Sequence, residues 1–412
     1  MKLYEFEGKR LFEQAGIPIP PGKVVSSVEE AGGLIGQLGS VMAKAQVLWG
    51  RRGKQNAIIA CDTEEQLADT LGTMLGRTLF SDKIEQVLVE KKVDIAQEVY
   101  LAVTYVGDSP TIIVSSQGGM DVEQAAHESQ EGVWKESIDI LKGFQPEQAA
   151  ALAHRAELDV HCPPPTDIMV RLYNMFIDSD ATLAEINPLV RTHAGDWIAA
   201  DSKVEIDEDA MFRQARLNLP ERLSSGRKPT PLEQLALDND RSDTRGAAGR
   251  MFYELDGDII VLASGGGTSV EALDNLCLLG GKPAVFTEYS GNPTPEKVKG
   301  LTKIALQHPG PINAIWVVGG RANFTDIYET LIGGIMGGIR ETPDFDKTIP
   351  ILIRRAGPRD EEAFAQLNKI QNHEGYRLFL RGMATSVADS ARMVINQAKK
   401  HREQSQPASA EI

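Results

Sequence analysis

The C-terminal part of the chain alternates short apolar segments with segments of helical periodicity, and this alternation constrains the fold more than any other feature. The apolar segments lie at 258–263, 283–288, 313–318, 350–355 and 376–380. Apolar residues at helical spacing lie between them, at 270–279, 295–306, 326–336 and 360–370. Short strands that alternate with helices form parallel sheets covered on both faces. We therefore predict a flavodoxin-like or Rossmann-like domain here.

Polar and glycine-rich segments follow four consecutive strands of this predicted sheet. They lie at 264–269, 288–292, 319–325 and 354–358. Taken singly, each has a plain interpretation as a tight turn, a helix cap or a surface arginine. Ligands of wound sheets bind beyond the carboxyl ends of the strands, so the four segments together indicate a site for a small polyanion such as a polycarboxylate. The GxGxxG dinucleotide fingerprint is absent, so hydride transfer with NAD is not supported.

The first half of the chain predicts a different α/β arrangement. Residues 98–106 and 111–114 alternate apolar and polar side chains around a Gly-Asp-Ser-Pro segment, which is typical of an antiparallel hairpin. Helical spacing recurs at 4–14, 27–38 and 146–157. No regular pattern continues past 217, where a polar, turn-rich stretch begins.

Length and composition set the organisation and exclude several classes of protein. A chain of 412 residues is too long for one core. The expected parts are an α/β domain, a linker with one helical turn, the parallel-sheet domain and a polar tail, over 1–217, 218–248, 249–402 and 403–412. The net charge of −15 argues against non-specific nucleic-acid binding.

The apolar and cysteine content adds expectations about location. No run approaches the roughly 18–20 apolar residues needed to cross a bilayer, so no membrane partner is expected. The first residues are amphipathic and carry acids, unlike a signal or transit peptide. The three cysteines, Cys61, Cys162 and Cys277, are far apart and are predicted to be free thiols in the cytoplasm.

Two segments of the first half carry residues suited to nucleotide chemistry, although no P-loop is present. Lys44 is followed by the basic, glycine-containing segment 50–54, which can neutralise phosphates but, taken alone, is equally typical of a solvated loop. Asn187 and Asp201 lie on two predicted strands joined by a short turn, which would place them side by side. An amide and a carboxylate oxygen suit Mg²⁺, whereas the plain alternative is a solvated acid.

Taken together, these segments resemble the β subunits of the succinyl-CoA synthetase and ATP-citrate lyase superfamily. The resemblance runs over nearly the whole chain, from EFEGKRLF at the start through LAEINPLV and the following DSK. It implies an ATP-grasp domain followed by a flavodoxin-like CoA-ligase domain. It also implies residues that contact ATP, namely Lys44, Arg52, Gly53, Lys54, Glu90 and Glu98. By the same resemblance Asn187 and Asp201 bind Mg²⁺, and the catalytic carboxylate of Glu185 lies near a phosphorylated histidine.

The strand-end segments indicate which branch of the superfamily is closest. EYSGN, GGRANFT and RRAGP resemble the citrate-binding loops of ATP-citrate lyase rather than the VGGGA and NIFGGI loops of succinyl-CoA synthetase. The residues expected to contact citrate are Gly266, Gly267, Ser290, Gly291, Asn323, Phe324, Thr325 and Arg355. The third loop is one residue shorter than in the fused animal-type enzymes, and Ala356 replaces a glycine.

The resemblance also implies a partner chain. None of the seven histidines lies in a glycine-flanked phosphohistidine loop, so an α-type subunit would supply that histidine, the main CoA site and a citrate-synthase-like module. The implied hetero-oligomer activates citrate with ATP, forms citryl phosphate and citryl-CoA, and releases acetyl-CoA and oxaloacetate. The alternatives are a citryl-CoA synthetase, a succinate– or malate–CoA ligase β subunit, and a non-catalytic scaffold subunit.

Overall fold

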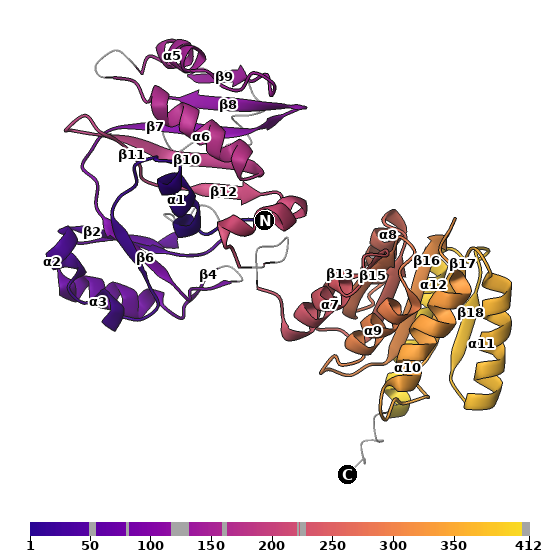
Figure 1. Cartoon of the computed structure of the whole chain (residues 1–412). Coiled ribbons are helices and arrows are strands. Elements are labelled where there is room, and N and C mark those ends of the chain that lie inside the picture. Colours follow the sequence, from indigo (N-terminus) through magenta and orange to yellow (C-terminus); the bar gives the residue numbers. More distant parts are fainter. Residues whose placement is uncertain are drawn as a thin grey trace. The chain divides into compact units, whose positions relative to one another are not determined.

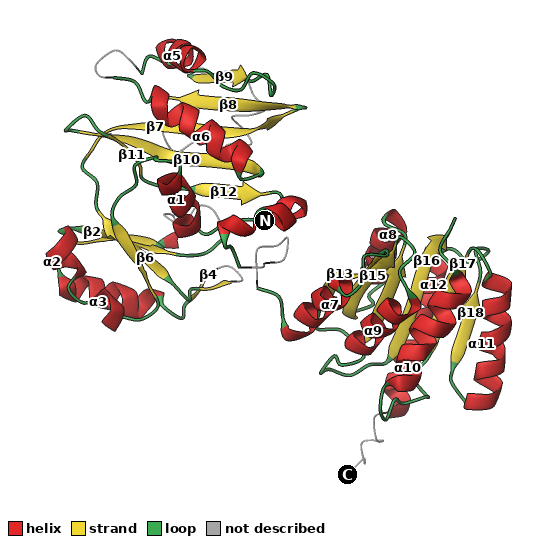
Figure 2. Cartoon of the chain, in the orientation of Figure 1, coloured by secondary structure: helices red, strands yellow, loops and turns green. Residues whose placement is uncertain are grey.

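The computed structural model describes residues 1–48, 55–79, 82–116, 132–158, 163–220, 222 and 228–405. The chain divides into two compact units, Met1–Lys228 (unit 1) and Pro229–Ile412 (unit 2), and each is described by itself (Figure 1). Helices and strands alternate through both units, as Figure 2 shows by colour. The Arg52, Gly53 and Lys54 predictions, the cysteine at 162 and most of the expected polar tail lie outside the described residues.

Unit 1 begins with a four-stranded antiparallel sheet of order β1-β6-β2-β3. Its strands are β1 (Gly22–Val25), β2 (Val41–Ala45), β3 (Ile58–Cys61) and β6 (Val87–Lys91). Helix α3 (Glu64–Met74) packs on it through Leu67, Leu71 and Met74, which recur at helical spacing. The helix predicted over 27–38 is split into a short 3₁₀ turn, η1 (Glu29–Ala31), and α2 (Leu34–Leu38), because two consecutive glycines interrupt it.

The second sheet of unit 1 has the order β11-β10-β7-β8-β9, and β12 also pairs with β10. Its strands are β7 (Ile95–Val106), β8 (Ser109–Ser115), β9 (Val133–Ser137), β10 (Ala181–Thr192), β11 (Trp197–Ala199) and β12 (Lys203–Ile206). The antiparallel pairing of β7 with β8 confirms the predicted hairpin. One face is covered by α1 (Glu5–Gln14), α5 (Pro146–Arg155) and α6 (Thr166–Asp178), and α1 and α5 confirm two predicted helices.

Three short elements complete unit 1. A two-stranded ribbon, β4 (Thr78–Leu79) with β5 (Asp82–Lys83), follows α3. The 3₁₀ segments η3 (Glu208–Arg213) and η4 (Ala215–Leu217) follow β12.

Unit 2 is a six-stranded sheet of order β13-β15-β14-β16-β17-β18. The strands are β13 (Ala247–Glu254), β14 (Ile259–Ser264), β15 (Pro283–Ser290), β16 (Ala314–Arg321), β17 (Ile351–Ala356) and β18 (Leu378–Arg381). The last five pair in parallel and confirm the predicted strands and the wound architecture. Strand β13, which the sequence pattern did not reveal, pairs antiparallel with β15 at the sheet edge.

Helices cover both faces of this sheet. On one face lie α8 (Gly267–Leu278) and α12 (Val387–Ser405), which bury Leu276 and Val394 among others. On the other lie α7 (Pro231–Arg241), α9 (Pro295–Ala305), the π-helical η5 (Glu329–Met336), α10 (Gly337–Glu341) and α11 (Asp360–Glu374). The carboxyl ends of the parallel strands and the segments that follow them therefore meet at one edge.

The segment expected to be a linker contains α7, which is longer than the single predicted turn. Thr230 caps this helix by accepting a hydrogen bond from the Glu233 N–H, and the Glu233 carboxylate accepts one from the Thr230 N–H. Glu233 is fully buried and also accepts a hydrogen bond from the Glu254 N–H of β13. The Thr-Pro-Leu-Glu sequence is a capping box, and this signal was available in the sequence.

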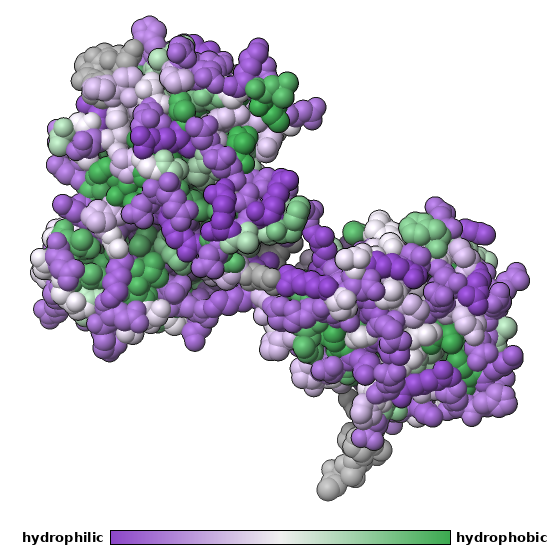
Figure 3. Space-filling view, viewed as in Figure 1, coloured by the Kyte–Doolittle hydropathy of each residue, from purple (hydrophilic) through white to green (hydrophobic). Residues whose placement is uncertain are grey.

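The visible surface of both units carries mostly hydrophilic residues, with smaller hydrophobic patches between them (Figure 3). Large apolar side chains are concentrated in the cores, although Leu141 and Leu278 are exposed. Cys61 is buried and Cys277 is exposed, and both are free thiols. Among the described residues, no helix combines the length and the apolar character that a membrane crossing requires.

Candidate functional site

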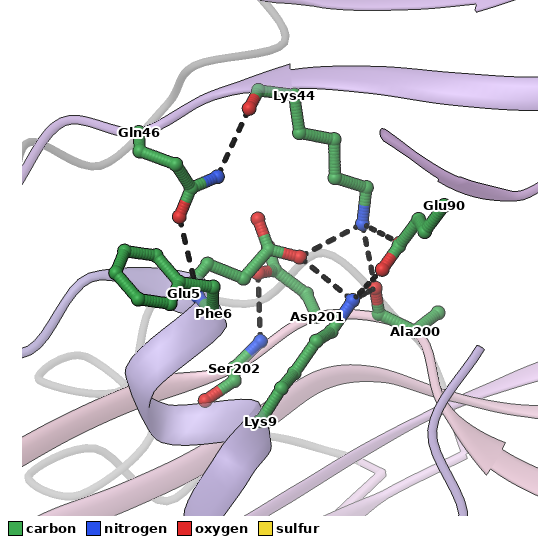
Figure 4. A network of polar contacts seen from close by, with 9 residues as sticks. All are labelled: Glu5, Phe6, Lys9, Lys44, Gln46, Glu90, Ala200, Asp201 and Ser202. Atoms are coloured by element: carbon green, nitrogen blue, oxygen red, sulfur yellow. Dashed lines mark hydrogen bonds and ion pairs between the residues drawn. The ribbon is translucent and has the colours of Figure 1, made fainter. Parts of the chain in front are cut away.

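Four charged side chains form one buried network in unit 1 (Figure 4). Lys44 comes from β2, Glu90 from β6, and Glu5 and Lys9 from α1. The Lys44 Nζ lies 2.9 Å from Glu5 Oε1 and 2.6 Å from Glu90 Oε1. The Lys9 Nζ lies 2.9 Å from Glu5 Oε1 and 2.5 Å from Glu90 Oε2. Two lysines thus share two carboxylates in a region closed to solvent.

Helix α1 presents Glu5 and Lys9 on one face because they are four residues apart. The next acid of the helix, Glu7, is also buried and forms a two-pronged pair with Arg222, at 2.9 and 2.6 Å. Gly8 allows a close approach, since a Cβ there would lie 2.1 Å from the Ser202 Oγ. The helix is thereby fixed against the 200–202 segment.

Both lysines of the network also donate to the carbonyl oxygen of Ala200, Lys44 at 2.6 Å and Lys9 at 2.9 Å. Asp201, the predicted metal ligand, is the next residue, and its carboxylate accepts a hydrogen bond from the Ser202 N–H at 2.7 Å. The predicted nucleotide lysine and the predicted metal carboxylate are therefore neighbours.

The ladder on either side of Asp201 places Asn187 directly across from it. Leu189 pairs with Ala199 in β11, and Glu185 pairs with Lys203 in β12, so the intervening register sets Asn187 opposite Asp201. The register agrees with the predicted neighbourhood of the two residues, and their role as metal ligands stays a prediction. The Asn187 side-chain amide donates to Glu185 Oε1 at 3.1 Å, which gathers all three predicted residues on one stretch of sheet.

Opposing influences act on the Lys44 ammonium. Burial lowers the pKa of Lys44, but the carboxylates of Glu5, Glu90 and Asp201 raise it, and the net pKa is above its ordinary value. Lys44 is therefore a permanent cation beside Asp201. A buried cation next to an amide–carboxylate pair suits the phosphates and the magnesium ion of a nucleotide.

Sequence reasoning placed some residues of this site and missed others. Glu98 lies on β7 opposite Val190 with its side chain exposed, outside the charged network. Glu5 and Lys9 were not predicted as site residues, although they belong to the EFEGKRLF segment that carried the resemblance. An acid and a base four residues apart on the buried face of an amphipathic helix were the available signal.

In unit 2, the predicted substrate loops lie at the carboxyl edge of the sheet. The glycine-rich loop turns with positive φ at Gly265 and Gly266, and α8 begins at Gly267. The Gly266 N–H donates to Glu288 Oε1 at 2.9 Å, so a carboxylate of the chain itself occupies this amide. One amide of this loop therefore already donates to a carboxylate, and the predicted binding of a polycarboxylate here stays a prediction.

Arg355 is the penultimate residue of β17 and is buried, with only 1% of its surface exposed. Its Nη1 donates to the Gly320 carbonyl at 3.2 Å, and the guanidinium passes over Gly319, where a Cβ would lie 2.0 Å from Nη1. Among the described residues, its Nε and Nη2 have no hydrogen-bond partner. A buried guanidinium with unmet N–H groups is costly unless an anion fills the place, so this geometry fits an acid ligand.

Tyr289 lies beside this arginine at the end of β15. The Arg355 Cζ is 5.7 Å from the centre of its ring, and its hydroxyl is buried with no partner in the described part of the chain. Burial raises the pKa of Tyr289, while Arg355 opposes that shift. The hydroxyl stays protonated and is a second buried donor on a residue that contacts Arg355, one that the predicted loop contacts did not include.

The preceding arginine has a different role. Arg354 donates from Nε to the Thr385 carbonyl at 2.9 Å and from Nη1 to the Gly319 carbonyl at 2.6 Å. Burial lowers the pKa of Arg354, Glu271 raises it, and Arg355 lowers it further. Neighbouring residues of a strand point to opposite faces, so only Arg355 lies on the face of Tyr289.

The remaining predicted contacts lie on the neighbouring loops. Ser290 is partly buried at the end of β15, and Gly291 is exposed with a positive φ. After β16, Thr325 is buried, whereas Asn323 and Phe324 are exposed, Phe324 to 68%. The edge of the sheet thus brings the predicted residues of unit 2 to one side. Thr325 and Arg355 are buried there and Ser290 is partly buried, whereas the other five are open to solvent.

Comparison with known proteins defines the class of the chain. The family model of the ATP-grasp domain matches residues 2–191, and the model described as ATP citrate lyase citrate-binding matches residues 233–397. These matches define an ATP-grasp protein with a citrate-binding type of second domain, and they agree with the two units of the structure.

Full-length relatives define the family. The chain is 32% identical over 367 residues to the β subunit of succinate–CoA ligase [GDP-forming] from Thermus thermophilus, covering 88% of this chain and 92% of the relative. It is 31% identical over 386 residues to the [ADP-forming] β subunit from Aquifex aeolicus, covering 90% and 93%. The chain therefore belongs to the family of succinate–CoA ligase β subunits, which confirms the predicted superfamily.

A solved structure confirms the fold. ATP citrate lyase from Methanothrix soehngenii, in complex with citrate and coenzyme A, is 20% identical and matches with a TM-score of 0.78. The match covers 96% of this chain and 99% of that chain. The predicted order of an ATP-grasp domain and a flavodoxin-like domain is thus correct, and the family is of the ATP-dependent acid–CoA ligase and citrate lyase type.

Proposed function

We propose that this chain is the ATP- and citrate-binding subunit of an ATP-citrate lyase. The observation that carries the proposal is the buried guanidinium of Arg355, whose Nε and Nη2 find no partner among the described residues. This arginine lies within the domain that the citrate-binding model matches. A tricarboxylate needs more donors than a dicarboxylate. In this proposal the Tyr289 hydroxyl, and the Gly266 amide once Glu288 releases it, would supply them.

Unit 1 supplies the nucleotide chemistry in this proposal. Lys44 stabilises the phosphates of ATP, and Asn187 with Asp201 would hold Mg²⁺, since the register of the flanking pairs sets the two residues at facing positions of the ladder. When bound, the ion neutralises phosphate charge. Glu185 orients the partner's histidine, and the predicted contacts of Glu90 and Glu98 with the nucleoside stay predictions.

The proposed reaction proceeds in four steps. The γ-phosphoryl group of ATP passes to a histidine of an α-type partner subunit and releases ADP. The phosphoryl group then passes to a carboxylate oxygen of citrate in unit 2 and gives citryl phosphate. The thiol of CoA, bound mainly by the partner, displaces phosphate and forms citryl-CoA. A citrate-synthase-like module of the partner splits citryl-CoA into acetyl-CoA and oxaloacetate.

A second candidate is a succinate–CoA ligase β subunit. It is favoured by the full-length relatives, which are succinate–CoA ligase β subunits and are 31–32% identical to this chain. The buried arginine beside Tyr289 and the match to a citrate-binding model favour citrate. A citryl-CoA synthetase differs from the lyase only in the last step, which this chain does not perform. The hetero-oligomeric state and the cytoplasmic location stay predictions.

Calorimetric titration of the full chain with citrate, succinate and malate tests this proposal. We expect citrate to bind most tightly and Arg355→Ala to lose that binding, because the variant removes the unpaired guanidinium. Arg392→Ala, an exposed arginine of α12, is the matched control for charge. A preference for succinate or malate in the wild-type chain would assign it to the sister ligases, and citrate binding that survives in Arg355→Ala would refute the site.

A further inference from the structure

We propose that Lys9 of α1 is a positioning residue that keeps the carboxylates of Glu5 and Glu90 neutralised while Lys44 turns to the nucleotide phosphates. The inference rests on the proposed function, because it presumes that Lys44 contacts ATP. Lys9 itself touches no substrate in this account. It acts through the two acids and through the segment that carries Asp201.

Lys9 makes the same contacts as Lys44. Lys9 and Lys44 address the same three acceptors, which are Glu5 Oε1, the Glu90 carboxylate and the Ala200 carbonyl. All the distances lie between 2.5 and 2.9 Å, and Figure 4 shows the two ammonium groups side by side. One lysine would be enough to hold the acids together. Because Lys9 also contacts both acids, the Lys44 ammonium can turn to a ligand without leaving the acids unpaired.

The positive and negative charges of the four-residue network balance. The network holds two lysines and two glutamates, so its formal charge is zero, and each side chain is at most 8% exposed. If Lys44 were the sole counter-ion, its movement to a phosphate would leave two buried carboxylates facing each other. Uncompensated buried charges are strongly unfavourable. With Lys9 in place, each carboxylate keeps a cation at hydrogen-bonding distance.

Helix α1, which carries Lys9, is held in place by contacts on two sides. The Phe6 N–H of α1 donates to Gln46 Oε1 at 3.2 Å, and the Gln46 amide donates to the Lys44 carbonyl at 2.9 Å. On its other side α1 abuts Ser202 at Gly8. The helix is therefore tied both to the backbone of β2 and to the 200–202 segment, so Lys9 does not have to move with the Lys44 ammonium.

The inference predicts a specific pattern of nucleotide affinities. In Lys9→Met, Lys44 is the only cation left to pair with Glu5 and Glu90. Its attraction to these two acids opposes its movement to the phosphates, so the Kd for MgATP rises about tenfold or more. In the double variant Lys9→Met/Glu5→Gln, the network has the same net charge as in the wild type, zero with Lys44 in place and −1 once Lys44 turns to the phosphates. The affinity therefore returns to within roughly threefold of the wild type. Lys9→Arg keeps the charge and also binds within roughly threefold.

Calorimetric titration of the full chain with MgATP, together with thermal unfolding of each variant, tests this pattern. Lys44→Met is included to distinguish a failure of the proposed ATP binding from a failure of the role of Lys9. If the wild-type chain binds no MgATP, or if Lys44→Met binds it as well as the wild type, the proposed function fails.

If the wild type binds, Lys44→Met does not, and Lys9→Met binds normally, only the role of Lys9 is overturned. The same holds if folded Lys9→Met loses affinity and the double variant does not regain it. Should Lys9→Met fail to fold, Lys9→Arg and the double variant decide. Near-normal MgATP affinity in both supports the role, and lost affinity in either, when folded, overturns it.

Discussion

The two units of the chain bury charged side chains in opposite ways. In unit 1, two lysines and two glutamates neutralise one another within 2.9 Å. In unit 2, Arg355 is buried just as deeply, but its Nε and Nη2 meet no partner in the described part of the chain. The first site is complete without a ligand and has to rearrange to accept one. The second leaves two N–H groups unmet, which the carboxylate of an acid would satisfy under the proposed function.

This contrast separates stability from binding. Removing one member of a paired buried network leaves an uncompensated charge, whereas replacing an unpaired buried cation by an apolar side chain removes a cost. Substitutions in the two units should therefore change the stability in opposite directions. The predictions below use that difference, beginning with the largest expected effect.

Glu5→Leu should destabilise unit 1 by about 3–5 kcal/mol, because both lysines then depend on Glu90 alone. Hydrogen exchange followed by mass spectrometry reads the two units separately and should show faster exchange in unit 1 only. Glu13→Leu, an exposed acid of the same helix, is the matched control. Unchanged exchange in Glu5→Leu would mean that the network contributes little to folding.

Arg355→Leu should lower the affinity for citrate roughly a hundredfold, about 2.7 kcal/mol, since a charged pair to the ligand is lost. The same variant should leave the unfolding free energy of unit 2 unchanged or slightly higher. Calorimetry and denaturant unfolding measure the two quantities. A loss of stability comparable to that of Glu5→Leu would contradict the contrast between the units.

Glu288→Gln should bind citrate about three- to tenfold more tightly than the wild type. The Glu288 carboxylate accepts the Gly266 N–H and thereby competes with a carboxylate of the ligand at the start of α8. Asp256→Asn, an exposed acid on the turn before β14, controls for the change in net charge. Weaker citrate binding in Glu288→Gln would show that this acid helps to hold the ligand instead.

The smallest effect concerns pH. The pKa of Lys44 in the folded chain is above its ordinary value, so the stability that Lys44 contributes is fully present below the unfolded pKa of about 10.4. It is lost only as the pH rises through the higher folded value. Replacing Lys44 by Met should therefore cost the same unfolding free energy at pH 7 and pH 9. A cost that shrinks by pH 9 would contradict the tight pairing.

Much of the fold could be predicted because local patterns determine it. The parallel strands of unit 2 are short apolar runs between helices, and the β7–β8 hairpin follows from alternation around a turn. Strand β13 escaped prediction because its pairing with β15 is irregular between Ala248 and Phe252 and several of its residues are exposed. Its sequence therefore lacks a clean alternation.

The candidate site divides in the same way. Asn187 and Asp201 could be predicted as neighbours because a short turn joins their strands. The charged network could not, because it joins residues 5, 9, 44, 90 and 200, whose proximity depends on how α1 packs against both sheets. The different roles of Arg354 and Arg355 could not be predicted either. They depend on which face of the sheet each side chain occupies, and the sequence alone does not tell which face lies toward the site.

The most direct test of the account is a crystal structure of the full chain grown with citrate. We expect a citrate carboxylate within hydrogen-bonding distance of Arg355 Nε or Nη2, a second near the 265–267 amides, and Glu288 displaced from Gly266. A citrate molecule bound elsewhere, or an Arg355 guanidinium that still has no partner in a chain saturated with citrate, would contradict the claim that unit 2 is built to hold this acid.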